Sequence, residues 1–386
     1  MSPTEPRIGL VLPGGAALGA YEAGVVDYVV RELGGELGSA ARPDVLCGTS
    51  VGAIGAAMLG AFADEPRVAA ARLVELWTNL RVERFLRPDV LGALASLCGC
   101  RAVVRRPGVG GLLDTRQIDR LVRDAIPFAR IGANVRRGLV SAVGITTTHV
   151  ASGHTVVFVE SDGPIRHWSR DRTLVAQPAR IGAEHVLASA AIPLLFPAIA
   201  IGGELYCEGG LRLNVPLSPA VHLGADRLLV VSPNYVAPPD ARLARARERA
   251  LSGPVFLLGR MLNALLLDRI DADIERLHQV NDILAAARPR ATATATATEP
   301  RLRIVQSLVV RASRSIGIMA ADYVRAPGFA RRGIVPRLLK QIAAAEGTAE
   351  ADLVSYLLFD GDFAAELIAL GRRDARAQHD ALCTLF

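Results

Sequence analysis

Residues 43–53, with the sequence PDVLCGTSVGA, combine a strand, a sharp turn and the start of a helix. The short apolar run Val45–Cys47 is typical of a buried strand. It is interrupted at Gly48, and the small and apolar residues of 51–63 then continue for long enough to form a buried helix. Ser50 lies at the junction, in the pattern Gly-x-Ser-x-Gly, so we expect its hydroxyl to be held at the edge of a sheet.

Gly48 and Gly52 lie two residues before and two residues after this serine. A sharp turn from strand to helix crowds its own backbone, so both positions need small residues. We therefore interpret Ser50 as a candidate nucleophile and the two glycines as the residues that allow its turn. A tight turn with a serine that caps the helix is the alternative interpretation of the same residues.

A second glycine-rich turn, 13–19 (PGGAALG), lies between an apolar strand predicted at 8–12 and a helix predicted at about 20–33. Glycines in this position expose backbone N–H groups beside a helix N-terminus, which is an arrangement that binds anions. The spacing matches neither the dinucleotide fingerprint nor a P-loop. The backbone donors that could stabilise an oxyanion are those of Gly14, Gly15, Ala16 and Val51.

Glu208 is the best-placed carboxylate, because it follows a predicted short strand and precedes two glycines. Neighbouring apolar segments would remove water from it, and burial raises the pKa of a carboxyl group and makes it a better base. A surface glutamate in a turn is the alternative. His222, His278 and His379 follow Glu208, but none lies in a glycine-flanked loop at a strand end, so no Ser-His-Asp arrangement is visible.

Composition sets broad limits on the class of protein. The 386 residues are 51% hydrophobic, enough for a large core in one or two domains. The net charge of +6 comes mostly from scattered arginines, which favours weak peripheral contact with anionic membranes. No zinc-finger, RNA-binding or basic-zipper pattern occurs, so we expect no nucleic-acid partner.

The five cysteines are odd in number and scattered, which favours a reducing compartment over a disulfide framework. Residues 1–7 show no signal-peptide pattern, and the uncharged span 45–63 contains the serine turn, so we expect a cytoplasmic protein without a transmembrane helix. Cys98 and Cys100 have no Cys/His pair at zinc spacing, so we expect no metal and no cofactor.

Four ordered blocks of the sequence resemble those of the patatin-like phospholipase family, including its bacterial members. The blocks are 13–25 (PGGAALGAYEAGV), 48–53 (GTSVGA), 189–197 (SAAIPLLFP) and 208–217 (EGGLRLNVPL). The resemblance covers about residues 7–233. It implies a three-layer α/β/α fold with a mostly parallel central sheet, and a Ser–Asp dyad without histidine that hydrolyses acyl esters of lipids.

Carried over to this chain, the resemblance makes Ser50 the nucleophile, with an oxyanion hole formed by Gly14, Gly15 and Ala16. The family usually has Asp where this chain has Glu208. One extra methylene moves the carboxylate by about a bond length, and a misplacement of about 1 Å can reduce a rate on the order of 100-fold. The family also usually has a Gly and a Lys or Arg at the positions of Ala16 and Leu18.

The expected function is that of a lipid acyl hydrolase of the phospholipase A or esterase type, which acts through an acyl-enzyme on phospholipids or other acyl-ester lipids. The alternative is a catalytically impaired protein that binds lipids or a partner, because of Glu208. We expect a catalytic core at 7–233 and a helical extension at 234–386. Within the core we expect a helix at 178–190. Within the extension we expect a long amphipathic helix at 254–287, a low-complexity loop at 291–298 and a late strand at 303–310. Lipid preference and oligomeric state are not encoded in any pattern of the sequence.

Overall fold

The structure is a computed structural model. It describes residues 6–82, 116–165, 168, 173–193, 196–236, 253–266, 269–286, 303–329, 333–346 and 350–386. The loop expected at 291–298 and the pair Cys98 and Cys100 lie outside these residues.

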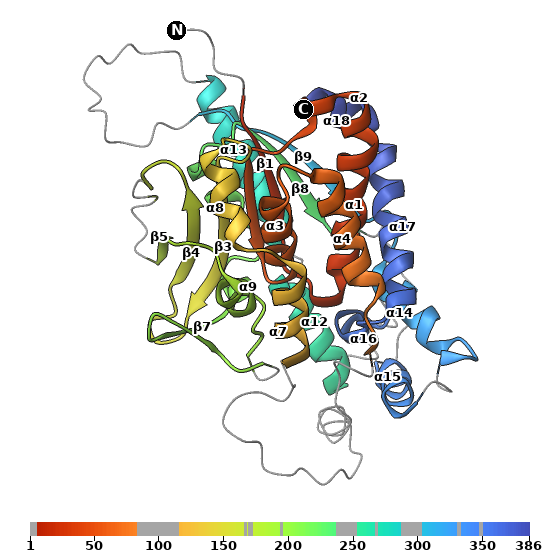
Figure 1. The fold of residues 1–386 in the computed structure, drawn as a ribbon. Helices are drawn as coiled ribbons and strands as arrows, with labels where there is room; N and C mark the ends of the chain where they lie inside the picture. Colours follow the sequence, from red (N-terminus) through yellow and green to blue (C-terminus); the bar gives the residue numbers. More distant parts are fainter. Residues whose placement is uncertain are drawn as a thin grey trace, which may run out of the picture.

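Within the described residues, nine strands form one sheet with helices on both sides (Figure 1). The main order of strands is β5-β4-β3-β2-β1-β8-β9. The bounds are β1 Ile8–Leu12, β2 Val45–Thr49, β3 Ala142–His149, β4 Thr155–Ser161, β5 Leu174–Pro178, β6 Ile199–Ile201, β7 Glu204–Glu208, β8 Arg227–Ser232 and β9 Gln306–Arg311. The five strands β3, β2, β1, β8 and β9 run parallel, whereas β4 and β7 pair with β3 in the antiparallel direction.

The helices that pack near the sheet or the site are α1 Gly19–Tyr28, α3 Val51–Ala61, α4 Pro66–Thr78, α7 Arg116–Ala125, α8 Ala129–Arg136, α9 Ala183–Ser189, α10 Leu217–His222, α12 Pro254–Leu266 and α13 Arg269–Ala286. The later helices are α14 Ile316–Arg325, α15 Ile334–Ala345, α16 Asp352–Leu357, α17 Gly361–Ala377 and α18 His379–Leu385. Short helical turns are η1 Ala16–Leu18, the π-helix η2 Val29–Leu33, α2 Gly34–Glu36, η3 Gly38–Ala41 and η4 Gly209–Leu211. None of the helices in the described ranges is both long and apolar enough to cross a bilayer.

The central strands bury both of their faces, which explains their continuous apolar sequences. In β1, Leu10 and Leu12 belong to the large core with α1, α3 and α4, whereas Val11 belongs to a second core with α10 and α13. Successive side chains of a strand point to opposite faces, so one strand supplies both layers. The result is the three-layer arrangement of helices, mostly parallel sheet and helices, as expected.

One sequence-based boundary differs from the structure. The helix expected from about 178 to 190 is shorter: β5 ends at Pro178, which has no N–H for the sheet, and α9 begins only at Ala183. The long helix expected at 254–287 is described as α12 and α13, on either side of residues 267–268, which lie outside the described ranges.

The C-terminal part of the chain packs closely on the N-terminal part. Strand β9 pairs with β8 in the parallel direction, and α17 lies along α1 (Figure 1). A Cβ atom on Gly24 of α1 would lie 2.2 Å from the carbonyl oxygen of Ile368, and one on Gly371 of α17 would lie 2.3 Å from that of Tyr21. The two helices therefore touch backbone to backbone. The division of the chain at 233 stays a prediction.

Candidate active site

Ser50 lies on a strained turn between β2 and α3. Its backbone has φ 55° and ψ −122°, a region that a residue with a side chain rarely adopts. A Cβ atom on Gly48 would lie 2.2 Å from the carbonyl oxygen of Gly52, and one on Gly52 would lie 2.2 Å from that of Leu12. Neither position has room for a side chain, so the close packing of this turn requires both glycines.

A second serine holds the backbone of this turn. The N–H of Ser50 donates to Ser189 Oγ over 2.8 Å, and the Ser189 hydroxyl donates to the carbonyl oxygen of Thr146 over 2.5 Å. All three residues are buried. Because Ser189 ends α9 and Thr146 lies in β3, this bridge fixes the turn relative to two neighbouring elements.

Glu208 ends β7, and β7 pairs with β3 on the side of the sheet where β2 ends. Its backbone is held on both sides: its N–H donates to the carbonyl oxygen of Ala191 over 2.9 Å, and its own carbonyl oxygen accepts from the hydroxyl of Thr148 over 2.9 Å. The carboxylate Oε1 accepts the N–H of Gly210 over 2.9 Å. The glutamate is therefore buried and positioned by its surroundings, and is not a surface residue in a turn.

Burial raises the pKa of Glu208 from 4.5 to about 7, although the Gly210 N–H and the Ser50 side chain both lower it. The Ser50 hydroxyl is thus close enough to favour the ionised carboxylate. Among the described residues, however, Glu208 Oε2 has no partner that meets the geometry of a hydrogen bond. Ser50 and Glu208 are therefore neighbours, but their side chains do not form a well-directed hydrogen bond.

The glycine-rich loop after β1 lies directly beside Ser50, because a Cβ atom on Gly14 would be 2.9 Å from the Ser50 Cβ. The N–H of Gly14 donates to Asn214 Oδ1 over 3.0 Å, and Asn214 Nδ2 donates back to the Gly14 carbonyl oxygen over 3.1 Å. The N–H groups of Gly15 and Ala16 have no such partner in the described part of the chain. Ala16 has φ 48°, so the loop, like the serine turn, is strained.

The pocket at Ser50 is apolar. Apart from the serine, its lining consists of Ala16, Val51, Ile54, Leu76, Trp77, Leu80, Ile118, Leu121, Ala190, Ile192, Phe196 and Phe359. These side chains come from both ends of the described sequence, so the C-terminal part contributes to the wall through Phe359. An apolar lining of this kind can accommodate a hydrocarbon chain, and it excludes water from the serine.

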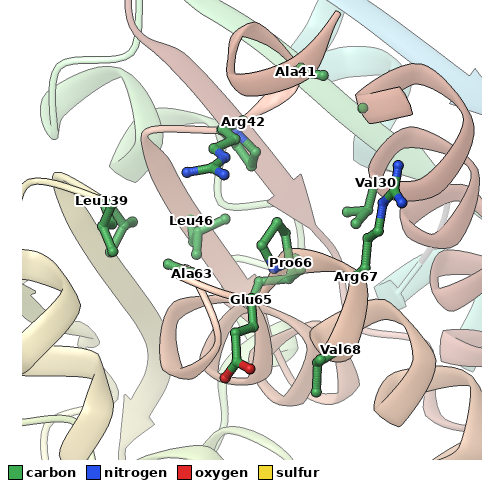
Figure 2. A pocket seen from close by; sticks show the side chains of 15 residues that line it. Val30, Ala41, Arg42, Leu46, Ala63, Glu65, Pro66, Arg67, Val68 and Leu139 are labelled. Atoms are coloured by element: carbon green, nitrogen blue, oxygen red, sulfur yellow. The ribbon is translucent and has the colours of Figure 1, made fainter. Parts of the chain in front are cut away.

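A second, larger cavity of about 400 Å³ lies at the opposite end of β2, near the residues that precede the strand. Figure 2 shows Arg42, Glu65 and Arg67 among apolar neighbours such as Leu46 and Leu139. None of the residues predicted for the site lines this cavity, so it is separate from the chemistry at Ser50.

The three candidate histidines lie elsewhere. The ring of His222 stacks on Trp168, His278 Nε2 lies 3.2 Å from Ser307 Oγ, and His379 contacts Tyr28. None of them lines the pocket at Ser50. The geometry therefore gives no support to a histidine as the base for this serine.

Sequence reasoning missed two residues of the site, Ser189 and Asn214. Both lie inside the blocks at 189–197 and 208–217, and each is polar within an apolar surrounding. That contrast was the available signal, because a buried polar side chain generally has a specific hydrogen-bonding partner. Which backbone group each one binds depends on the fold and could not be read from the sequence.

The model of the patatin-like phospholipase family matches residues 10–221, and this chain belongs to that family. Lipid hydrolysis is the general activity that this membership supports. A search of curated proteins found no match. Among solved structures, the crystal structure of VipD from Legionella pneumophila is similar with 13% sequence identity and a TM-score of 0.31, over 89% of this chain and 66% of VipD. This chain therefore spans about two thirds of the length of VipD.

Proposed function

We propose that this protein is a lipid acyl hydrolase of the phospholipase A or esterase type, with Ser50 as nucleophile and Glu208 as its general base and acid. The observation that carries this proposal is the placement of a buried carboxylate beside a serine on a strained turn, at the mouth of an apolar pocket. Gly15, Ala16 and Val51 supply the oxyanion donors, and Gly14 supports them because Asn214 already binds its N–H.

In the proposed reaction, the ester carbonyl lies against the loop after β1 and the acyl chain enters the apolar pocket. Ser50 Oγ attacks the carbonyl carbon and its proton passes to Glu208, while the N–H groups stabilise the negative oxygen. Collapse of the intermediate breaks the ester bond, and Glu208 returns the proton to the departing alcohol. A water molecule then attacks the acyl-enzyme with Glu208 again as base, which releases the fatty acid and restores Ser50.

A base with a pKa of about 7 suits this cycle, because the same group must accept a proton and then return it near neutral pH. Burial produces that value. A glutamate exposed to water would remain ionised near pH 7, and would be a weaker base and a poor acid.

Fluorophosphonate labelling of the full chain tests the proposed nucleophile. We expect labelling at Ser50 and hydrolysis of p-nitrophenyl esters and phospholipids, both of which Ser50→Ala abolishes. The matched control is Ser152→Ala, which removes an exposed serine and should leave both signals unchanged. Labelling that persists in Ser50→Ala would contradict covalent catalysis by this residue.

The second candidate function is a catalytically impaired protein that binds lipid or a partner, and one observation favours it: Glu208 Oε2 lacks a well-formed bond to Ser50. The substitution Glu208→Asp distinguishes a working hydrolase from an impaired protein. A Cβ atom on Gly209 would lie 2.3 Å from the Thr146 carbonyl oxygen, so the backbone cannot shift to bring a shorter side chain forward. If the site works with Glu, Asp should reduce kcat roughly 10- to 100-fold. A large gain in activity would instead identify an impaired enzyme.

A further inference from the structure

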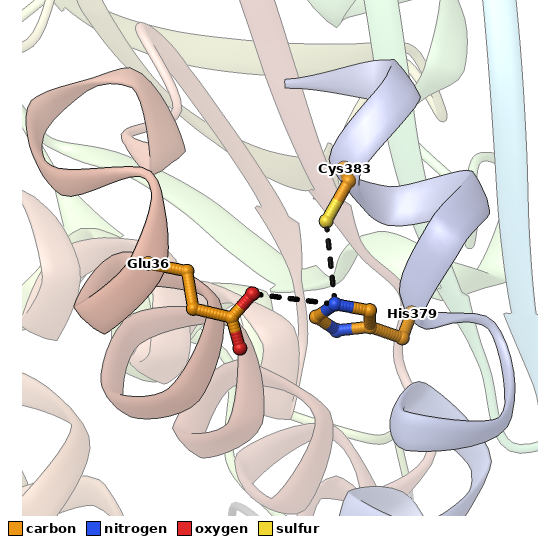
Figure 3. A group of neighbouring side chains, drawn as sticks. All are labelled: Glu36, His379 and Cys383. Carbon is orange, nitrogen blue, oxygen red and sulfur yellow. Dashed lines mark hydrogen bonds and ion pairs between the residues drawn. The ribbon is translucent and has the colours of Figure 1, made fainter.

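We propose that Glu36, His379 and Cys383 form a binding site for a transition metal ion of the zinc class. Two of its three residues, His379 and Cys383, lie in α18, more than a hundred residues beyond the region that matches the family model, whereas Glu36 lies within that region. Figure 3 shows the imidazole of His379 between the carboxylate of Glu36 and the thiol of Cys383. One potential ligand atom from each residue lies within 4.8 Å of the other two.

The distances between these atoms match a tetrahedral ion. His379 Nε2 lies 3.5 Å from Cys383 Sγ and 3.3 Å from Glu36 Oε2. With Zn–N and Zn–O bonds of about 2.0–2.1 Å and a Zn–S bond of about 2.3 Å, tetrahedral angles separate N from S by about 3.5 Å and N from O by about 3.4 Å. Both distances from His379 Nε2 thus already have the values that a tetrahedral ion requires, and a carboxylate oxygen of Glu36 lies within 4.8 Å of Cys383 Sγ.

The chemistry of the donors selects the ion. Imidazole and thiolate are preferred ligands of Zn²⁺ and its neighbours, whereas Mg²⁺ and Ca²⁺ favour sets made of oxygen alone. His379 and Cys383 are four residues apart on α18 and therefore share one face of the helix. Three protein ligands leave a fourth position for water.

The orientation of the imidazole is also fixed from the other side of the ring. The Tyr28 hydroxyl lies 2.9 Å from His379 Nδ1, and a hydroxyl can accept the Nδ1 proton while Nε2 keeps its lone pair for the metal. The guanidinium of Arg376 lies 5.8 Å from the centre of the Tyr28 ring and pairs with Glu32 at 3.5 Å. Its charge is therefore partly compensated.

The elements that carry these residues explain what the ion would do. Tyr28 ends α1, Glu36 ends α2, and the π-helix η2 lies between them. Single π-helical turns are rare and occur often at functional sites. A metal bound here would join α18 to the end of the first helical segment and so stabilise the folded chain.

Metal binding to the full chain, in the Ser50→Ala background, tests this proposal without any measurement of hydrolysis. Equilibrium dialysis should give one tightly bound Zn²⁺ per chain, and Co²⁺ should give a thiolate-to-cobalt charge-transfer band with the intense visible bands of a tetrahedral site. Cys383→Ser should remove the charge-transfer band. His379→Ala should weaken binding at least 100-fold, and Tyr28→Phe should weaken it roughly 10- to 100-fold through the orientation of the ring.

The matched control is the double variant Cys98→Ser, Cys100→Ser, which removes two other thiols and should keep the cobalt spectrum. A spectrum that disappears in this control but persists in Cys383→Ser would place the metal elsewhere and overturn the proposal. Absence of Zn²⁺ binding by the full chain would also overturn it. Glu36→Gln is the mildest change, since the side chain is exposed; it should fold normally and bind Zn²⁺ at least tenfold more weakly.

Discussion

Glu208 combines full burial with a negative charge, and the two are in conflict. Its pKa of about 7 lies about 2.5 units above the usual value, and one unit corresponds to about 1.4 kcal/mol. The ionised carboxylate therefore destabilises the fold by roughly 3 kcal/mol. Between pH 4.5 and about 7 the folded chain keeps a proton that the unfolded chain has released, so stability decreases as the pH rises through this window.

We expect kcat/KM to rise about tenfold per pH unit below pH 7 and to level off above it, because in the proposed mechanism the Ser50 proton passes to the ionised form of Glu208. Glu208→Gln should lose at least about 100-fold in rate and should be more stable than the parent protein above pH 7. Rate–pH profiles and denaturant unfolding at several pH values measure both effects. A rate that is independent of pH from about pH 5 to pH 9 would exclude Glu208 as the base.

Ser189 is the residue through which α9 and β3 position Ser50, the proposed nucleophile. Ser189→Ala would leave the buried N–H of Ser50 and the carbonyl oxygen of Thr146 without this bridge. We expect the free energy of unfolding to fall by about 1–3 kcal/mol and kcat to fall roughly tenfold with little change in KM. A decrease in stability with unchanged kcat would mean that the bridge supports the fold alone.

At the scale of elements, the site depends on how closely the start of α3 approaches the end of β1. Gly52 touches the backbone carbonyl of Leu12, whereas Gly55, one turn further along the same helix, faces only the flexible end of the Leu12 side chain. Both glycines lie in α3 and face Leu12, but a methyl group at Gly52 would meet backbone, whereas one at Gly55 would meet a side chain that can move.

Gly52→Ala should therefore destabilise the protein by at least about 3 kcal/mol or prevent soluble expression, because backbone atoms must move apart. Gly55→Ala is the matched control and should change stability by no more than about 1 kcal/mol, because the higher helix propensity of alanine offsets the cost of displacing the Leu12 side chain. Denaturant unfolding measures both. Equal effects of the two substitutions would contradict the close approach at Gly52.

The sequence alone predicted the serine turn, the first glycine loop and most central strands, because each is encoded by neighbouring residues. A buried strand next to glycines, as at 43–53, leaves few alternatives. Contacts between distant segments were not encoded in this way. The pairing of Asn214 with Gly14 and the bridge from Ser189 arise only when four segments meet at one edge of the sheet. The length of the helix at 178–190 was overestimated because Pro178 still belongs to an edge strand.

At the scale of the whole molecule, the N-terminal and C-terminal parts share one core. The backbones of α1 and α17 touch at Gly24 and Gly371, and Phe359 lines the pocket of Ser50. The segment that resembles the family is therefore covered and completed by helices from the last quarter of the chain.

Gly371→Ala should force α17 away from the Tyr21 carbonyl oxygen and lower the melting temperature by a few degrees or more. Gly328→Ala, where an added Cβ meets nothing within 4 Å, is the matched control and should leave the melting temperature unchanged.

A chain truncated after Asp360 loses α17 and α18 and should aggregate, since α1 would expose apolar surface. A soluble, folded truncation would show instead that residues 1–360 fold independently. Thermal unfolding and size-exclusion chromatography provide the measurements.

The late position of α17 also has a consequence during synthesis on the ribosome. A ribosome adds about 5–20 residues per second, so the serine turn emerges many seconds before the helix that covers α1. During that interval the nascent chain contains the residues of the candidate site, but the apolar face of α1 is still exposed because α17 has not yet been synthesised. Chaperones that bind nascent chains would bind this face, and the proposed hydrolysis would begin only after α17 has left the exit tunnel.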